Sequence, residues 1–459
     1  MQKNRFPDQA DAVCVLGLED LDCSASLKWL NIPRDLYLVG DFSDAGIPPE
    51  VLNHPRARCF LIETPLQHEW MIKEIAWHAV MQSMHIQCQP GWEEFRRRLE
   101  ECHLAAHLLI SETSDFGQEA FFNARRNWLQ NGPFRGWTVL KGRFKDVPAI
   151  VCGAGPNLKE ASAYLESLSS RALLLSAGTA SSILGEWGIA PHLSFFIDKQ
   201  TPFDLIVQQP FLEIPSCLQS RLDPKCVRWL HGEKILAPES GPLPWEQWLL
   251  GENSSPSFGW TVGNFATQAA IWMGCNPIIW AGMDLCYQED RKYAGRSTQN
   301  EALLIECDGR MTQRDWLLAA RFSEELSCNH PEIRFINTAM QGLPLRPPIE
   351  TMPLSSVNQT LTREYDLTGR LYQSLQGGNL LAGVDQKITE WDASWERCAA
   401  ICSDLSVQIE ALAQEAVYEY YLEPLWRIWR PLFNREARGQ NLDWHRLLFF
   451  QQVLHNRSI

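Results

Sequence analysis

The amino-acid sequence predicts an α/β protein whose central domain is doubly wound and Rossmann-like. Between residues 113 and 350, short apolar runs alternate with helical patterns, as in a parallel sheet covered by helices on both faces. One run ends in the glycine turn GAGPN, and small or polar residues follow several others. The strands are expected, in order, at residues 149–152, 172–178, 192–198, 276–284 and 333–338.

Two smaller regions flank the central domain. Residues 1–112 are expected to form an N-terminal α/β domain, because three apolar runs precede a helical pattern there. Residues 201–260 break the alternation with Pro, Trp and Ser, which predicts an insertion or lid over the strand ends. Residues 351–459 are expected to form a C-terminal helical bundle.

An apolar seam at helical spacing supports the C-terminal prediction. It predicts a bundle within the chain, or a coiled-coil pair that makes a homo-oligomer through the C-terminal helices. The seam consists of Val384, Ile388, Trp391, Trp395, Cys398, Cys402, Leu405, Ile409, Leu412 and Ala416.

The composition is that of a globular protein and disfavours several classes. A net charge of −14 over 459 residues disfavours a protein that coats nucleic acid or an anionic membrane. The 14 cysteines form no C-x-x-C pair, which is typical of reduced thiols in a cytoplasmic protein. No membrane span is predicted, because no long uninterrupted apolar run occurs.

The glycine turn is expected to bind an anionic ligand at a helix start. Gly153 and Gly155 allow close approach of the backbone, Pro156 suits a first helical turn, and Asn157 adds an amide. A dinucleotide fingerprint is disfavoured because Leu158 replaces its third glycine, and a P-loop because no Gly-Lys-Ser/Thr follows. On this stretch alone, a tight turn that binds no ligand remains open.

The ends of the other expected strands supply further groups. Asp198 and Asp284 each follow an apolar run. Open α/β sheets bind ligands at the carboxyl ends of their strands, so these residues are expected to meet at one site. The predicted ligand-binding residues are Gly153, Gly155, Pro156, Asn157, Gly178, Thr179, Gly263, Asn264 and Gly282.

Several stretches carry a family resemblance: GRFKDVPAIVCGAGPNLKEA, ALLLSAGTASSILGEWGIAPHLSFFIDKQ, VGNFATQAAIWMGCNPIIWAGMDLCYQEDRKYAG and FINTAMQGLPL. Together they resemble the central domain of the motility accessory factor (Maf) family, which includes flagellin glycosyltransferases. They are also similar to the archaeal 6-hydroxymethylpterin diphosphokinase. The turn GAGPNLKE is similar to the G-N-G-P-S-L-K-E turn that holds the cytidine nucleotide in bacterial sialyltransferases. The resemblance covers roughly residues 113–345.

The resemblance implies a nucleotide-binding transferase and leaves its chemistry open. The favoured interpretation is transfer of a nonulosonic, sialic-acid-like sugar from a CMP-linked donor to an acceptor hydroxyl, for example on a protein, with no cofactor required. Asp198 or Asp284 would act as the base or orient it, and Lys292 would neutralise the leaving group. The alternatives are ATP-dependent pyrophosphoryl transfer with Mg²⁺, and a non-catalytic nucleotide-binding scaffold.

This chain departs from the family pattern at two places. Asn157 stands where the turn usually carries serine. The pattern after the Asp-Leu pair usually reads K-t-H-a, whereas this chain reads Lys292-Tyr293-Ala294, without the histidine. A proton carrier in place of that histidine would be Tyr293 or His192.

Overall fold

A computed structural model describes residues 10–18, 35–41, 47–54, 56–62, 66–199, 210–238, 245–250, 257–288, 293–294, 304–377, 380–381, 384–403, 414–423, 425–426, 449–450 and 453. The contacts divide the chain into two units, Met1–Asp115 with Leu425–Val453 and Phe116–Pro424 with Leu454–Ile459. The predicted boundary at residue 112 lies inside helix α4 (Glu93–Gln130), and the contacts place no division at residue 350. The limits of three domains therefore remain predictions.

The first unit contains a parallel sheet in the order β3-β2-β1-β4. Alternate strand residues enter two cores: Cys14 and Val39 pack with Ile75 of α3, whereas Val13 and Leu36 lie on the other face. This arrangement confirms the predicted N-terminal α/β domain. Its elements, besides the first part of α4, are β1 (Ala12–Leu16), β2 (Asp35–Asp41), α2 (Pro49–Leu52), β3 (Ala57–Ile62), α3 (Leu66–His78) and β4 (Met84–Cys88).

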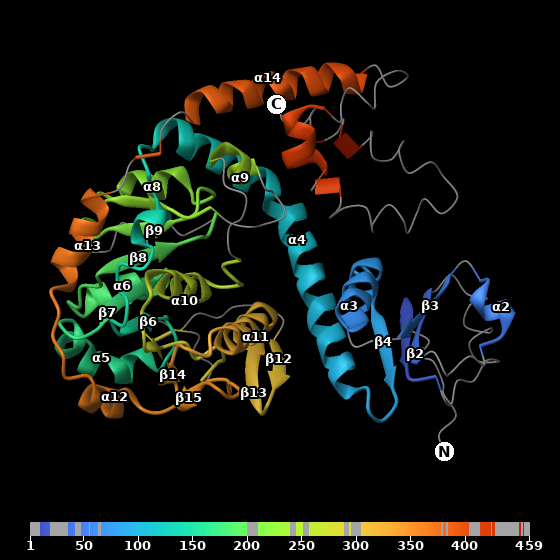
Figure 1. The fold of residues 1–459 in the computed structure, drawn as a ribbon, viewed down its shortest axis with the longest axis horizontal. Helices are drawn as coiled ribbons and strands as arrows, with labels where there is room; N and C mark the ends of the chain where they lie inside the picture. Colours follow the sequence, from blue (N-terminus) through green and yellow to red (C-terminus); the bar gives the residue numbers. More distant parts are fainter. Residues whose placement is uncertain are drawn as a thin grey trace. The chain divides into compact units, whose positions relative to one another are not determined.

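The second unit is built on a parallel sheet of nine strands in the order β15-β14-β11-β6-β7-β8-β9-β10-β5 (Figure 1). The expected strands all form: β6 spans its whole predicted run, and the other four are shorter than predicted. The strands are β5 (Arg135–Gly136), β6 (Ala149–Cys152), β7 (Leu173–Ala177), β8 (Leu193–Phe196), β9 (Ser216–Leu218), β10 (Lys234–Leu236), β11 (Ile278–Ala281), β14 (Phe335–Asn337) and β15 (Glu350–Thr351).

Helices cover both faces of this sheet because alternate side chains of its strands enter two cores. Val151 of β6 packs in one core with Phe265 of α10 (Val262–Met273). Ile150 packs in the other core with Leu165 of α5 (Leu158–Leu168) and with α6 (Thr179–Glu186). The residues of β6 are fully buried, as expected for a central parallel strand. The doubly wound prediction is confirmed.

The segment predicted as an insertion or lid contributes strands to the main sheet instead. Within 201–260, β9 pairs with β8, and β10 pairs with β9, both in parallel. Two short helices accompany them, α8 (Pro224–Trp229) and α9 (Trp245–Leu250). The strands escape a sequence search because each has only three residues, too few to show a period. Residues 201–209, 239–244 and 251–256 lie outside the described part of the chain.

The first C-terminal helices complete the core of the second unit. Helix α12 (Leu354–Thr360) packs on α5, and α13 (Leu367–Gln376) packs on the 3₁₀ turn η1 (Trp137–Leu140). Helix α14 (Val384–Ser403) carries the described half of the seam, and all five of its seam residues through Cys398 are buried.

That half of the seam packs within the chain. Trp395 meets the rings of Phe121 on α4 and Tyr421 in the π-helical turn η2 (Tyr418–Leu422), and Trp391 meets Trp248 of α9. Of the remaining seam residues, Ala416 is partly buried, and the structure does not describe Leu405, Ile409, Leu412 or the side chain of Cys402. Association of two copies through these helices remains a prediction.

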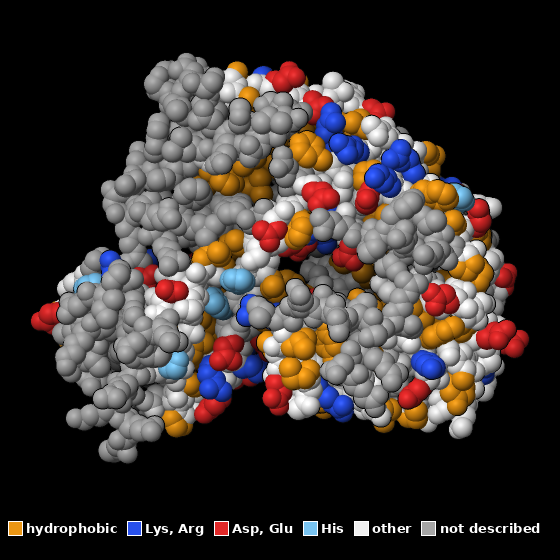
Figure 2. All heavy atoms as spheres, turned by 180° about the vertical axis from the view of Figure 1, so that it is seen from behind, with side chains coloured by type: hydrophobic (Ala, Val, Ile, Leu, Met, Phe, Trp, Pro, Cys, Tyr) orange, Lys and Arg blue, Asp and Glu red, His pale blue; other side chains and the backbone are white. Residues whose placement is uncertain are grey.

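One face of the described surface is mixed in charge (Figure 2), and the described helices are not of the membrane-spanning kind. On the face drawn in Figure 2, acidic and basic side chains of the described residues are interspersed. Among the helices that the structure describes, none combines the length and the apolar character needed to cross a membrane.

Candidate functional site

The chain order of the central sheet reverses between β6 and β11. From β6 the chain runs through β7 and β8 to one side, and it later returns through α10 to β11 on the other side of β6. The carboxyl ends of two such strands frame the usual ligand site of an open α/β sheet. A cavity of about 230 Å³ lies there. Among the predicted residues, its lining includes Gly153, Gly155, Gly178, Thr179, Asp198, Gly263, Gly282 and Asp284.

Three glycines bring the ends of β6 and β11 into direct backbone contact. The N–H of Gly153 donates to the carbonyl of Ala281, and the N–H of Gly155 donates to that of Gly282, both at 2.8 Å. A Cβ at Gly153 would lie 2.5 Å from the Gly282 oxygen, and a Cβ at Gly155 would overlap the Asp284 carboxylate. The φ of Gly282 is +69°. Packing between the two strand ends therefore requires these glycines, independently of any ligand.

Asp284 lies at the start of helix α5, where the sequence predicts the phosphate of a ligand. The N–H of Asn157 donates to both carboxylate oxygens of Asp284, at 3.2 Å each. The side-chain amide of Gln288 donates to Oδ1 at 2.5 Å. Asp284 is only 1% exposed, yet it lines the cavity. A carboxylate of the chain itself thus occupies the positive end of the α5 dipole.

The protonation of Asp284 changes near neutral pH. Burial raises the pKa of its carboxyl to about 7, the hydrogen bond from the Asn157 N–H opposes this increase, and the negative charge of Glu160 adds to it. A buried carboxyl with such a pKa, at the wall of a ligand-sized cavity, is suited to take or give a proton.

Pro156 and Asn157 shape the glycine turn but are not among the lining residues. The side-chain amide of Asn157 donates to Glu160 in the first turn of α5, at 3.4 Å. Asn157 therefore acts on the site through its backbone N–H, and a direct contact of either residue with a nucleotide remains a prediction.

The start of α10 forms another part of the wall. Thr261 caps the helix, since its hydroxyl accepts from the N–H of Asn264, and both Thr261 and Gly263 line the cavity. The side chain of Asn264 does not reach the lining. It is fully buried, and its amide donates to Ser323 on helix α11 (Arg314–Asn329) at 3.0 Å. This amide joins α10 to α11, and a contact of Asn264 with a nucleotide remains a prediction.

The ends of β7 and β8 contribute smaller or more exposed groups. Gly178 has a φ of +52° and directly precedes Thr179, the first residue of α6. Asp198 follows β8 and is exposed, although it lines the same cavity as Asp284.

Aromatic and acidic side chains form a further part of the described cavity wall, and the sequence analysis missed two of them, Asp315 and Trp316. Trp260 comes before α10, and Asp315 and Trp316 lie in the first turn of α11. The rings of Trp316 and Tyr287 are 5.3 Å apart. Helix α11 follows the hairpin of β12 (Leu304–Cys307) and β13 (Arg310–Gln313), far along the chain from the glycine turn. In the sequence, the one sign of these two residues was an acidic residue followed by an aromatic residue at the start of a helix.

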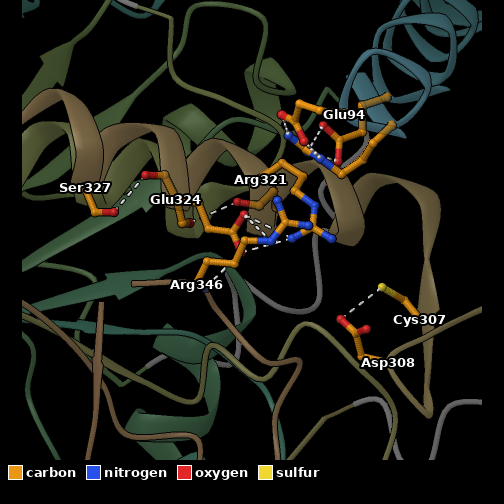
Figure 3. A network of polar contacts seen from close by, with 11 residues as sticks. Glu94, Cys307, Asp308, Arg321, Glu324, Ser327 and Arg346 are labelled. Carbon is orange, nitrogen blue, oxygen red and sulfur yellow. Dashed lines mark hydrogen bonds and ion pairs between the residues drawn. The ribbon is translucent and has the colours of Figure 1, made fainter. Parts of the chain in front are cut away.

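A polar network holds α11 in place (Figure 3). Both carboxylate oxygens of Glu324 accept from Arg321 at 3.0 Å, and one also accepts from the backbone N–H of Arg346 at 3.0 Å. Arg346 belongs to the segment after β14, so this buried carboxylate ties α11 to the sheet. The tie fixes the helix that carries Asp315 and Trp316.

The described lining is acidic. It contains Asp198, Asp284 and Asp315 but no Lys, Arg or His side chain among the residues that the structure describes. Lys292, predicted to be catalytic, lies outside those residues, immediately before Tyr293, which lines the cavity. Burial raises the pKa of Tyr293 to about 12, so its hydroxyl is neutral at physiological pH.

The described part of the site contains no histidine and no cluster of side chains that could bind a metal ion. His192 accepts from the N–H of Leu174 at the amino ends of β7 and β8, the opposite edge of the sheet, and burial lowers its pKa to about 4. Over the described ranges, no three His, Cys, Asp or Glu side chains are grouped as metal ligands. The Mg²⁺ of the alternative interpretation remains a prediction.

Comparisons with known proteins identify the type of domain. Residues 126–290 match the family model described as 6-hydroxymethylpterin diphosphokinase MptE-like. The chain is also similar to the structure of a Maf glycosyltransferase from Magnetospirillum magneticum AMB-1, with a TM-score of 0.58 and 14% identity. That match covers 97% of this chain and 77% of the other. No curated protein matches the chain.

These matches confirm the resemblance to the Maf and MptE-like proteins. Residues 126–290 are similar to the MptE-like family, and the chain has the fold of the Maf glycosyltransferase. The matched segment contains the glycine turn, Asp198 and Asp284, whereas Asp315 and Trp316 lie beyond it. A shared fold does not specify a reaction, which depends on the groups at the site. The similarity of the turn to that of sialyltransferases remains a prediction.

Proposed function

We propose that this chain is a glycosyltransferase that moves a nonulosonic sugar from a CMP-linked donor to an acceptor hydroxyl, with Asp284 as the general base. One observation carries the proposal: a buried carboxyl with a pKa of about 7 lines the cavity at the switch point of the sheet. The Maf fold supports the choice of reaction.

In the proposed step, the acceptor oxygen bonds to the anomeric carbon of the donor sugar while its proton passes to Asp284. The bond from that carbon to the phosphate oxygen breaks, and its electron pair leaves with CMP. Gly178, Thr179 and Gly263 would contact the nucleotide from the cavity wall. Asp198 would orient the acceptor, and Lys292 would neutralise the departing phosphate.

The MptE-like match favours a second candidate, the transfer of pyrophosphate from ATP to 6-hydroxymethylpterin. The same carboxyl could take the proton of the pterin hydroxyl. The described lining carries three carboxylates and no cationic side chain, and a triphosphate brings more negative charge into such a cavity than a single phosphate does. This difference favours the glycosyl donor.

Nucleotide release distinguishes the candidates. The chain is incubated separately with a CMP-linked nonulosonic donor, a UDP-linked sugar, and ATP with 6-hydroxymethylpterin, and the released nucleotide is measured by chromatography. We expect CMP from the first mixture alone. The matched control is Asp284→Asn, which should lower the rate by about 100-fold or more, with CMP affinity changed less than about threefold.

Two results would contradict the proposal. Release of AMP that requires the pterin would establish the second candidate. Tight CMP binding with no release from any donor would indicate a nucleotide-binding scaffold.

A further inference from the structure

Two side chains near Asp284, Gln288 and Glu160, should affect the charge of its carboxyl in opposite ways. The amide of Gln288 donates to Oδ1 of Asp284 at 2.5 Å. Glu160, on the first turn of α5, is linked to Asp284 through Asn157: the backbone of Asn157 donates to Asp284, and its side chain donates to Glu160 at 3.4 Å. One neighbour therefore donates a hydrogen bond to the carboxylate, and the other places a second negative charge near it.

We propose that Gln288 and Glu160 are positioning residues that set the protonation state of Asp284 in opposite directions. Gln288 stabilises the ionised carboxylate with its hydrogen bond, and Glu160 stabilises the protonated form by repulsion. The proposal rests on the proposed function only in giving this proton a role in the transfer step.

Gln288 acts on Asp284 through a hydrogen bond, and Glu160 acts through its charge. A hydrogen bond to the charged form of an acid lowers its pKa, so removal of the Gln288 donor should raise the pKa of Asp284. A nearby like charge raises the pKa of an acid, so removal of the Glu160 charge should lower it. The second effect should be smaller, because Glu160 is exposed and water screens its charge.

The other titratable groups of the described cavity lining do not alter the difference between the Asp284 midpoints of the variants and of wild type. Burial raises the pKa of the Cys286 thiol to about 11 and that of Tyr293 to about 12, so both stay neutral in the test range. Asp198 and Asp315 line the same cavity from the end of β8 and from α11, and they are present in every variant.

The experiment uses the full chain with Gln288→Met, Glu160→Gln and a matched control, Gln219→Met. Gln219, the residue that follows β9, is buried, and its side-chain amide has no hydrogen-bond partner among the described residues, so its replacement breaks no hydrogen bond there. The titration of Asp284 is followed by carbon NMR of labelled carboxyl groups and assigned by the loss of its signal in Asp284→Asn. The pH dependence of kcat/KM is measured in parallel.

We expect the NMR midpoint of Asp284 to rise by about one pH unit in Gln288→Met and to fall by about half a unit in Glu160→Gln. The acid limb of kcat/KM should move with it, and Gln219→Met should leave both unchanged. General damage to the site cannot produce shifts of opposite sign.

Unchanged midpoints in both variants, or shifts in the same direction, would overturn the inference. Opposite NMR shifts without movement of the acid limb would uphold the influence of both residues on Asp284. They would at the same time refute the proposed role of Asp284 as the base.

Discussion

Asp284 and Asp198 occupy equivalent places in the sequence and different environments in the structure. Each follows an apolar strand of the central sheet, and both line one cavity. Asp284 is almost fully buried and accepts hydrogen bonds from Asn157 and Gln288, whereas Asp198 is exposed to solvent. Burial raises the pKa of the Asp284 carboxyl to about 7.

The positions of their strands explain this difference. β11 lies beside β6 at the switch point, where the glycine turn covers Asp284 from one side and the segment after β14 covers it from another. In that segment, the N–H of Leu343 donates to the backbone carbonyl of Asp284 at 2.7 Å. β8 lies farther along the sheet, away from the switch point. The same local pattern therefore gives a buried carboxyl with a raised pKa where two loops close over it.

Turnover should separate the two aspartates most strongly. We expect Asp284→Asn to lower kcat by about 10²–10⁴-fold, since an amide cannot act as the base. Asp198→Asn should lower it by about tenfold or less, because water screens an exposed carboxylate. Single-turnover kinetics with saturating donor measure both effects. Equal losses in the two variants would remove the functional distinction between these residues.

The free energy of unfolding should depend on pH through the titration of Asp284. Its folded-state pKa is raised from 3.8 to about 7, so its contribution to stability is present in acid and is lost as the pH rises through 7. Asp284→Asn removes this dependence. Relative to wild type, the variant should gain up to about 4 kcal/mol of unfolding free energy between pH 4 and pH 8.

Thermal unfolding of the ligand-free protein at several pH values measures this gain. The partly buried His192, whose pKa is lowered to about 4, contributes a pH dependence of stability with the opposite sign, but it is present in both proteins and cancels in the difference. Gln219→Met, which changes no titratable group, serves as the control and should follow wild type. A constant difference between Asp284→Asn and wild type across the pH range would contradict the burial argument.

The sequence was sufficient for the fold where strands are central and apolar. β6, β7, β8 and β11 are buried on both faces, so their apolar runs are visible without any alignment. β9 and β10 were missed because three-residue strands at the side of a sheet depend on pairing with a neighbour more than on their own pattern. The same dependence on distant partners limits what local sequence can reveal about the site.

At the site, the sequence predicted which strand ends line the cavity. It did not predict which side chains face the cavity and which bond to other helices. Asn264 is placed at the expected helix start, yet its amide is taken up by Ser323 of α11, a partner 59 residues away. Trp316 and Asp315 reach the cavity through a hairpin and a helix that no local pattern connects to the glycine turn. Burial and pairing over such separations are tertiary effects, which spacing along the chain does not encode.

The aromatic wall provides a contrast with Asp284 because it should affect binding and not chemistry. We expect Trp316→Ala to raise KM by roughly tenfold with little change in kcat, since stacking of a ring on an indole acts equally in the ground and transition states. Trp229→Ala, at a partly exposed tryptophan of α8 that is not among the lining residues, is the control. A fall in kcat with unchanged KM would instead place Trp316 in the chemical step.

Chelation should have the smallest effect of all, and it is the most direct check on the distinction between the two aspartates. A metal held jointly by Asp198 and Asp284 would make them equivalent, and either Asn variant would then weaken nucleotide binding sharply. The burial of one carboxyl and the exposure of the other argue against such equivalence. We therefore expect the Kd for CMP, measured by calorimetry, to be the same within about twofold in EDTA and in Mg²⁺. ATP should be tested in the same way, because binding that requires Mg²⁺ and fails in both Asn variants would restore the equivalence and favour the pyrophosphoryl-transfer candidate.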